Sequence, residues 1–248
     1  QQYERYPAFL AEVDRYLAHL REMPKPDPAA LASAYLWRAH ALEQTDGQAN
    51  ALVEAYRGAV EAEPTRLGVW RRFFSVARNA GAMGTFREAL VTCSAQAAPR
   101  DEGLPVELAA LGYAYAQGGR ALAHATDVLR EVVEARVAAE GAEAAEAEQG
   151  WLLDLIMDEA QQSNLSDYER ATVILGVGRV LAVLGEFRAA EDLLARIQPH
   201  LLGHEYLICL QERAQALLEL GRTRDALPLL REQTAKHPSD LAVCSRKR

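Results

Sequence analysis

The chain has 248 residues, of which 50% are apolar and 25% are charged, and its formal net charge at pH 7 is −8. These values are ordinary for a soluble protein of one or two domains. No stretch of 18 apolar residues occurs, so the sequence predicts no insertion into a membrane.

The distribution of apolar residues predicts helices along the whole chain. Apolar residues at helical spacing indicate a leading helix over residues 3–23, and the prolines of the 24–28 segment end it. Asp27 followed by Pro28 is a favourable helix start, because an Asp N-cap precedes a proline at the first helical position. Further helices are predicted over 28–44, 48–62, 67–79, 85–98, 104–117, 120–139, 143–162, 166–184, 187–198, 204–220 and 223–236. No run alternates with a period of two, so we predict no strand.

A turn of the form Gly-x-x-Arg-x-Ala recurs along the chain. Clear copies begin at Gly84, Gly185 and Gly221, and weaker ones begin at Gly47 and Gly119. The gaps between successive glycines are 37, 35, 66 and 36 residues. A period in this range is typical of solenoids, in which each unit buries its apolar face against its neighbours. Each glycine is expected to reverse the chain with a positive φ angle between the two helices of a hairpin.

The repeated units resemble tetratricopeptide repeats, in which a turn glycine, a small alanine and a large apolar residue recur in phase. The matching positions are Gly47, Tyr56, Ala59 and Pro64; Leu111, Gly112, Tyr115 and Gly119; Val177, Gly178, Leu181, Gly185, Ala190 and Leu194; and Ala214, Leu217, Gly221, Ala226, Leu230 and Pro238. Trp70 fits the tryptophan position of a further unit. The resemblance implies an all-α, right-handed superhelical solenoid of antiparallel helix pairs, with five recognisable repeats.

The predicted organisation is a leading helix in residues 1–23, a helical-repeat domain over 28–238, and the start of a truncated helix or tail in 239–248. The 66-residue gap marks an irregular insert at about 140–165, which holds either one unpaired helix or a degenerate pair. Between Val137 and Glu169 there are nine acidic residues and no Lys or Arg, so the rest of the chain sums to about +1. The chain opens on Gln1 rather than Met, and we expect it to be part of a larger protein.

Two surfaces are candidates for partner binding. Members of this family bind peptides or helices in a groove that their first helices line. Carried over to this chain, that groove consists of Trp37, Arg71, Arg78, Asn79, Tyr113, Arg179 and Gln215. Arginines and aromatic residues suit an acidic or extended peptide. The alternative is that the aromatic residues fill the core and that the arginines form a solvated face.

The second candidate is an acidic patch that could meet a basic partner or a metal ion. It consists of Glu140, Glu143, Glu146, Glu148, Asp154, Asp158 and Glu159. The alternative is a solvated helix face, which is the usual meaning of a charge run. Positive charge is not clustered, so we expect no nucleic-acid partner.

Other chemical motifs are weak. His200 and His204 are four residues apart, but Gly203 separates them at a predicted turn and no third ligand is near. Gly176-x-Gly178 lies within a predicted helix and indicates close packing rather than a phosphate loop. Cys93, Cys209 and Cys244 are widely spaced, which argues against a disulfide framework and favours a reducing compartment.

These observations predict a non-catalytic scaffold that docks a partner protein or peptide within a multiprotein assembly. We expect no enzymatic activity, no cofactor and no bound metal, and a cytoplasmic location. One alternative is a regulatory domain that senses a ligand or peptide. Another is a periplasmic envelope scaffold for polysaccharide or protein export.

Overall fold

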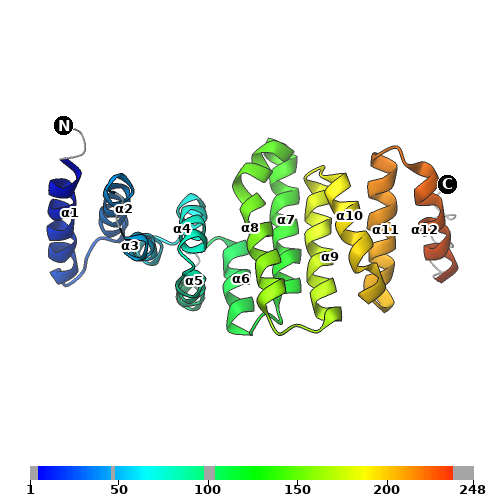
Figure 1. Ribbon diagram of the computed structural model, residues 1–248, viewed down its shortest axis with the longest axis horizontal. Helices are drawn as coiled ribbons and strands as arrows, with labels where there is room; N and C mark the ends of the chain where they lie inside the picture. The colour runs from blue at the N-terminus through cyan, green and yellow to red at the C-terminus, as the bar shows by residue number, and fades with distance from the viewer. Residues whose placement is uncertain (1–4, 46–47, 98–103, 237–248) are drawn as a thin grey trace. The chain divides into compact units, whose positions relative to one another are not determined.

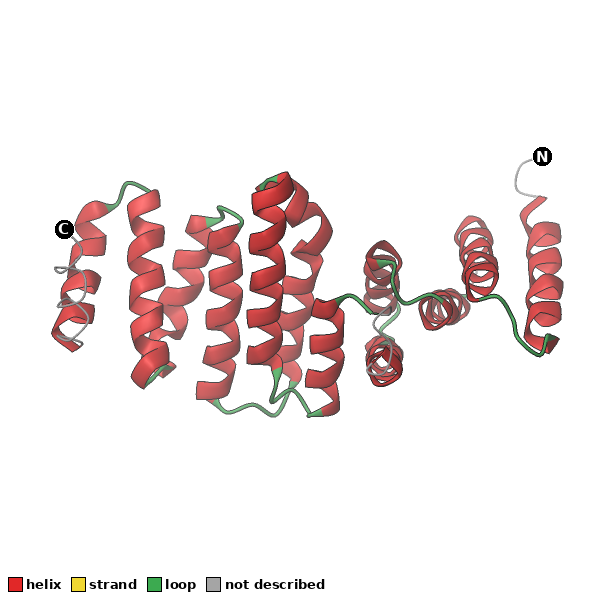
Figure 2. Ribbon diagram, turned by 180° about the vertical axis from the view of Figure 1, so that it is seen from behind, coloured by secondary structure: helices red, strands yellow, loops and turns green. Residues whose placement is uncertain are grey.

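A computed structural model describes residues 5–45, 48–97 and 104–236, and these residues form an all-α fold without strands (Figures 1 and 2). The predicted all-α class is therefore confirmed. The chain divides into two compact units, unit 1 (Gln1–Ala116) and unit 2 (Gln117–Arg248). None of the helices in the described ranges is both long and apolar enough to cross a membrane.

Unit 1 is built from helices that pack mainly against their neighbours in sequence. These helices are α1 (Arg5–Glu22), α2 (Pro28–Gln44), α3 (Ala49–Ala62), α4 (Leu67–Asn79), α5 (Met83–Ala97) and α6 (Val106–Ala116). The closest pair is α2 with α3, and α5 packs on α3, α4 and α6. An aromatic cluster of Trp70, Phe73, Phe74 and Phe86 joins α4 to α5. Trp70 is fully buried, and its indole N–H donates to the Pro64 carbonyl (2.9 Å).

The described part of unit 2, residues 117–236, forms three helical hairpins. Its helices are α7 (Leu122–Glu140), α8 (Ala142–Gln162), α9 (Asp167–Val183), α10 (Phe187–Ile197), α11 (Gly203–Glu219) and α12 (Thr223–Lys236), with a 3₁₀ turn (Gln198–His200) after α10. The hairpins are α7 with α8, α9 with α10 and α11 with α12, and their tight turns lie at the same end of the unit (Figure 1). Consecutive hairpins contact through α7 and α9 and through α10 and α11.

Three turns share one hydrogen-bond pattern. In each, a glycine with a positive φ angle ends a helix: Gly81 (67°), Gly185 (84°) and Gly221 (72°). The N–H of the residue after each glycine donates to the carbonyl four residues before that glycine, at 2.8 or 2.9 Å. This is the Schellman motif, which satisfies carbonyls that the helix end leaves open. The next helix begins two residues after each glycine.

One predicted turn glycine is wrong. Gly84 lies inside α5, and Gly81 reverses the chain three residues earlier. The residue that corresponds to Ala190 and Ala226 is consequently the buried Phe86 rather than Ala89. Gly119 does have a positive φ angle (86°), and Gly47 lies outside the described residues.

The predicted pairing of the helices over 104–117 and 120–139 stays a prediction. These helices correspond to α6 and α7, which belong to different units. In unit 1, α6 packs on α5, and in unit 2, α7 packs on α8. The predicted insert therefore contains one helix, α8, and its hairpin partner is α7. Gly141, with a φ angle of 94°, makes the turn between them.

Side-chain caps stabilise the starts of two helices. The carboxylate of Asp27, the predicted cap, accepts from the backbone N–H of Ala29 (3.2 Å) at the start of α2. Ser166 and Glu169 form a reciprocal capping box at the start of α9. Pro228 lies inside α12.

Candidate functional site

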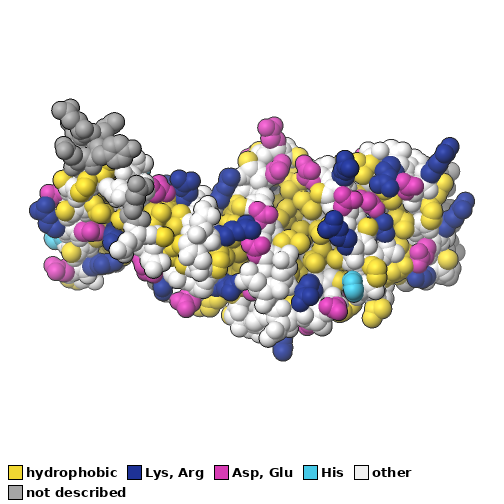
Figure 3. Space-filling model, in the orientation of Figure 1, with side chains coloured by type: hydrophobic (Ala, Val, Ile, Leu, Met, Phe, Trp, Pro, Cys, Tyr) yellow, Lys and Arg dark blue, Asp and Glu magenta, His cyan; other side chains and the backbone are white. Residues whose placement is uncertain are grey.

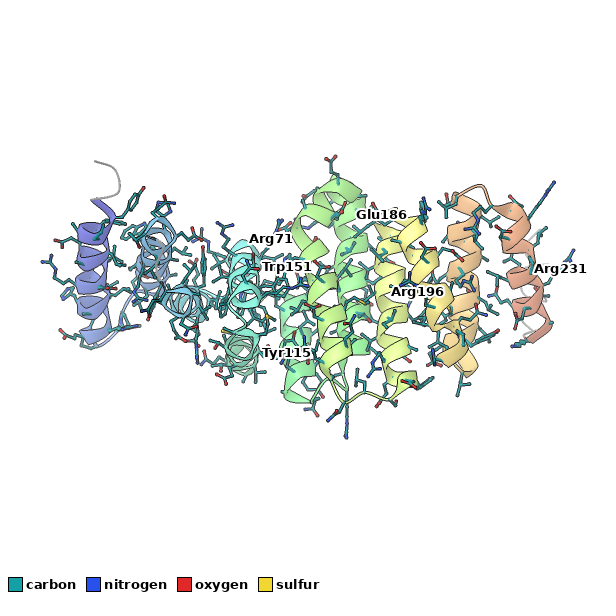
Figure 4. The ribbon with its side chains drawn as sticks, in the orientation of Figure 1. Arg71, Tyr115, Trp151, Glu186, Arg196 and Arg231 are labelled. Atoms are coloured by element: carbon teal, nitrogen blue, oxygen red, sulfur yellow. The ribbon has the colours of Figure 1, made fainter. Side chains whose placement is uncertain are left out.

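Five of the predicted groove residues lie on unit 1 and are exposed. They are Trp37 on α2, Arg71, Arg78 and Asn79 on α4, and Tyr113 on α6. Trp37 is 50% exposed and Tyr113 is 55% exposed, so neither fills the core. The Trp37 ring lies against Tyr16 with the ring centres 6.3 Å apart, and the Arg78 guanidinium lies over the Phe74 ring at 5.7 Å. Figure 4 labels Arg71 on α4.

The other two predicted groove residues lie on unit 2 and contact neighbouring acids. The half-buried Arg179 on α9 donates to Glu212 on α11 (3.2 Å) and to Asp127 on α7 (3.4 Å). Arg179 thus links three helices, and its contacts are those of a structural residue. Gln215 is exposed and donates to Glu219 one turn further along α11 (2.7 Å).

The seven predicted acidic residues do not form one surface. Glu148 pairs with Arg136 of α7, which also lies 3.7 Å from Glu140. Glu159 is buried and accepts a hydrogen bond from Ser163 (2.9 Å). Asp158 is half-buried. The acids of α8 that remain exposed are Glu143, Glu146 and Asp154.

Two of these exposed acids border a groove of about 520 Å³ in unit 2. We call it the α8–α10 groove, and its lining residues are Glu146, Gly150, Trp151, Leu153, Asp154, Met157, Val177, Leu181, Leu184, Glu186, Ala189 and Leu193. Residues of α9 form the floor of the groove. Helices α8 and α10 both contact α9 and form its two walls. Met157, Leu181 and Leu193 are only partly buried, so the groove presents apolar side chains to solvent.

The charges of the groove have a single sign. Glu146, Asp154 and Glu186 are its charged lining residues, and all three are exposed. Within the described ranges none of them forms an ion pair. In Figure 3 an apolar area extends over this part of unit 2, and both acidic and basic side chains lie near it. Figure 4 labels two lining residues, Trp151 on α8 and Glu186 just before α10. The groove therefore combines partly exposed apolar side chains with three exposed carboxylates.

Sequence analysis missed most of this groove. It placed Glu146 and Asp154 in the acidic patch, and it treated Trp151 and Met157 only as parts of the helix predicted over 143–162. Glu186 and Ala189 were part of a turn motif and were not considered as site residues. Their proximity depends on three helices packing together, and the sequence carries no direct signal for it.

The remaining motifs have structural roles. Burial raises the pKa of the Cys93 and Cys209 thiols to about 12, so both are unreactive core residues. Gly176 and Gly178 are packing residues, as predicted, because a Cβ atom there would lie 2.0 Å from Thr126 Oγ1 and 2.6 Å from Leu194 Cδ2, respectively. No group of three His, Cys, Asp or Glu side chains suited to a metal ion occurs in the described part of the chain.

Comparison with known proteins gives no assignment: no family model matches the chain, and no curated protein matches it significantly.

Proposed function

We propose that this protein is a non-catalytic scaffold that docks a partner protein within a larger assembly. The observation that carries the proposal is the α8–α10 groove, where apolar side chains are partly exposed between two helical walls. Contiguous apolar surface that remains open to solvent is typical of interaction sites. The two buried, free thiols support a cytoplasmic location as part of the same proposal.

The proposal includes a tetratricopeptide-like, right-handed superhelical arrangement of the hairpins. The recurrence of one Schellman turn at Gly81, Gly185 and Gly221 supports it, because identical turns followed by helices at the same offset are typical of repeats. The buried Ala190 and Ala226 occupy the same position after their glycines. Small-angle scattering of the chain tests this part: an elongated, curved particle supports it and a sphere contradicts it.

Site-specific cross-linking tests the docking function. A photoreactive amino acid placed at Ala189, which is exposed and lines the groove, should cross-link a single partner in cells. The same group at Glu143, which is exposed on α8 outside the groove, is the matched control. The proposal predicts a stoichiometric complex from the first position and none from the second.

A second arm of the experiment compares the two candidate surfaces. Ala189→Arg should block the groove and abolish co-purification of the cross-linked partner. Arg71→Glu with Arg78→Glu should leave co-purification unchanged. If co-purification of the partner is lost only in the arginine variant, the docking surface lies on unit 1. Retention of the partner in both variants would contradict docking at either surface.

A ligand-sensing domain is the second candidate function, and the groove volume favours it because about 520 Å³ lies in the range of small-molecule sites. A melting-temperature screen against metabolites separates the two functions. A compound that raises the melting temperature of the wild-type protein but not of Ala189→Arg would favour sensing over docking.

A further inference from the structure

We infer that the partner segment in the α8–α10 groove is an amphipathic α-helix whose apolar stripe is bordered by Lys and Arg. This inference depends on the scaffold function proposed above and adds the chemical class of the partner. It comes from the shape of the groove and from the sign of its charges.

The shape of the groove suits a helix. Its floor is the α9 stripe of Val177, Leu181 and Leu184, and residues at spacings of three and four lie on one helix face. Its two walls are also helices, so a bound helix would pack against α8, α9 and α10 together. Partly exposed Met157 on one wall and Leu193 on the other would then be covered. Methionine adapts to side chains of different shapes, which suits a binding groove.

An extended partner is a poorer fit. One way in which extended peptides gain affinity is by pairing their backbone with the edge of a sheet, and the described residues contain no strand that could serve. A helix satisfies its own backbone hydrogen bonds and needs only an apolar stripe to bind. The groove offers that stripe and no row of backbone groups.

The acidic residues of the groove determine which side chains should border the apolar stripe of the bound helix. Glu146 and Asp154 lie eight residues apart on α8, which is about 12 Å along the wall. Glu186 lies beside the opposite wall, at the start of α10. Because no basic side chain lines the groove, a helix with Lys or Arg on both borders of its stripe meets carboxylates on both sides. Charge complementarity at the rim of a binding site accelerates association and disfavours partners that carry the same charge as the rim, here acidic ones.

Synthetic peptides test the inference directly. The first probe is an 18-residue helical peptide with Leu at i, i+3, i+4, i+7 and i+11 and Lys or Arg on both borders of that stripe. The second keeps every Leu and replaces the basic residues by Glu. The third contains the residues of the first in a scrambled order with a central proline.

Methyl NMR of the methionines gives the location of binding. The chain has three methionines, of which Met157 lines the groove while Met23 and Met83 lie in unit 1. The basic peptide should shift the Met157 methyl signal and leave the other two unchanged. Its affinity should exceed that of the Glu peptide about tenfold at low salt, and the difference should shrink at high salt because the rim charges are exposed.

Charge-reversal variants test the role of the rim. The double variant Glu146→Lys with Glu186→Lys should bind the basic peptide about tenfold more weakly and bind the Glu peptide more tightly. Glu131→Lys with Glu143→Lys changes the net charge equally at exposed acids outside the groove and should alter neither affinity beyond about twofold. An equal loss in both variants would mean that only net charge matters and would overturn the inference.

The outcomes separate this inference from the scaffold function. If Met157 shifts equally with the basic and the Glu peptide, the groove docks helices but does not select basic ones, and only the inference fails. If no peptide shifts Met157 while cross-linking from Ala189 still captures a partner, the helix assignment is wrong and the scaffold function stands. If no peptide shifts Met157 and no partner is cross-linked from Ala189, both the inference and the scaffold function fail.

A Met157 shift that depends on protein concentration without peptide would identify a second copy of the chain as the occupant and overturn the inference.

Discussion

Gly176 on α9 packs directly against Thr126 on α7. A Cβ atom on Gly176 would lie 2.0 Å from Thr126 Oγ1, and Thr126 itself is buried. The hydroxyl of Thr126 donates to the Ala123 carbonyl (2.6 Å), so the side chain is held in place. The contact brings the backbones of two successive hairpins of unit 2 close together, and only glycine allows this approach.

Gly176→Ala is therefore expected to destabilise the protein by about 1–3 kcal/mol, the usual cost of adding a methyl group to a filled core. Denaturant unfolding measures the change. Gly150→Ala is the matched control, because its Cβ atom would lie 3.5 Å from the nearest side-chain atom, Glu146 Cγ. Alanine is the better helix former, so this control should stabilise α8 by roughly 0.5–1 kcal/mol. A neutral Gly176→Ala would contradict the close packing of α7 and α9.

Leu217 and its neighbour Leu218 should respond differently to truncation. Leu217 is 2% exposed and packs with Ala214 and Ala226 in the core between α11 and α12, whereas Leu218 is 39% exposed. Leu217→Ala should lower the free energy of unfolding by about 2–5 kcal/mol, since it removes buried methyl groups and leaves a cavity. Leu218→Ala should cost well under about 1 kcal/mol. Equal effects would mean that the repeat register of this hairpin is wrong.

The buried thiols should resist modification. Burial raises the pKa of Cys93 and Cys209 to about 12, so each stays protonated and poorly nucleophilic at pH 8. In a Cys244→Ser variant, Ellman's reagent should find no reactive thiol in the native protein and two after denaturation. Fast reaction of either thiol under native conditions would show that unit 1 or unit 2 opens readily.

The capping box at the start of α9 predicts a pH dependence. The Glu169 carboxylate accepts hydrogen bonds from the backbone N–H and the hydroxyl of Ser166, both at 2.8 Å, and these lower its pKa from the ordinary 4.5. A carboxyl whose folded pKa is depressed stabilises the fold above its unfolded pKa and loses that contribution as pH falls through the folded pKa.

Thermal unfolding of Glu169→Gln and the wild-type protein checks this sign. Their melting temperatures should differ at pH 7, and the difference should shrink as the pH falls below 4.5 through the lowered pKa of Glu169. Ser166→Ala should cost about 1 kcal/mol at pH 7, as is usual for the loss of an N-cap.

The helices themselves could be predicted from the sequence because local signals decide where they begin and end. Asp27 with Pro28 gave the start of α2, and the helix predicted over 166–184 is α9, which begins directly after its N-cap Ser166. The turn at Gly84 was mispredicted for an instructive reason. The Gly-x-x-Arg-x-Ala motif matches better at Gly84 than at Gly81. The Schellman hydrogen bonds around Gly81, however, already satisfy the open carbonyls at the end of α4.

Pairing between helices was harder to predict than their ends. The repeat spacing gave no sign of the turn at Gly141, across which α7 packs on α8. Gly141 has a positive φ angle, but it is not part of a Gly-x-x-Arg-x-Ala motif. The α8–α10 groove depends on this pairing, and its residues could not be gathered until the pairing was known.

The two walls of the α8–α10 groove have unequal lengths. α8 has 21 residues and α10 has 11, which corresponds to a difference of about 15 Å. A guest longer than α10 would therefore meet both walls over part of its length and α8 alone over the rest. The two ends of the groove are not equivalent, so a bound segment has a preferred polarity and its N- and C-terminal halves meet different surroundings.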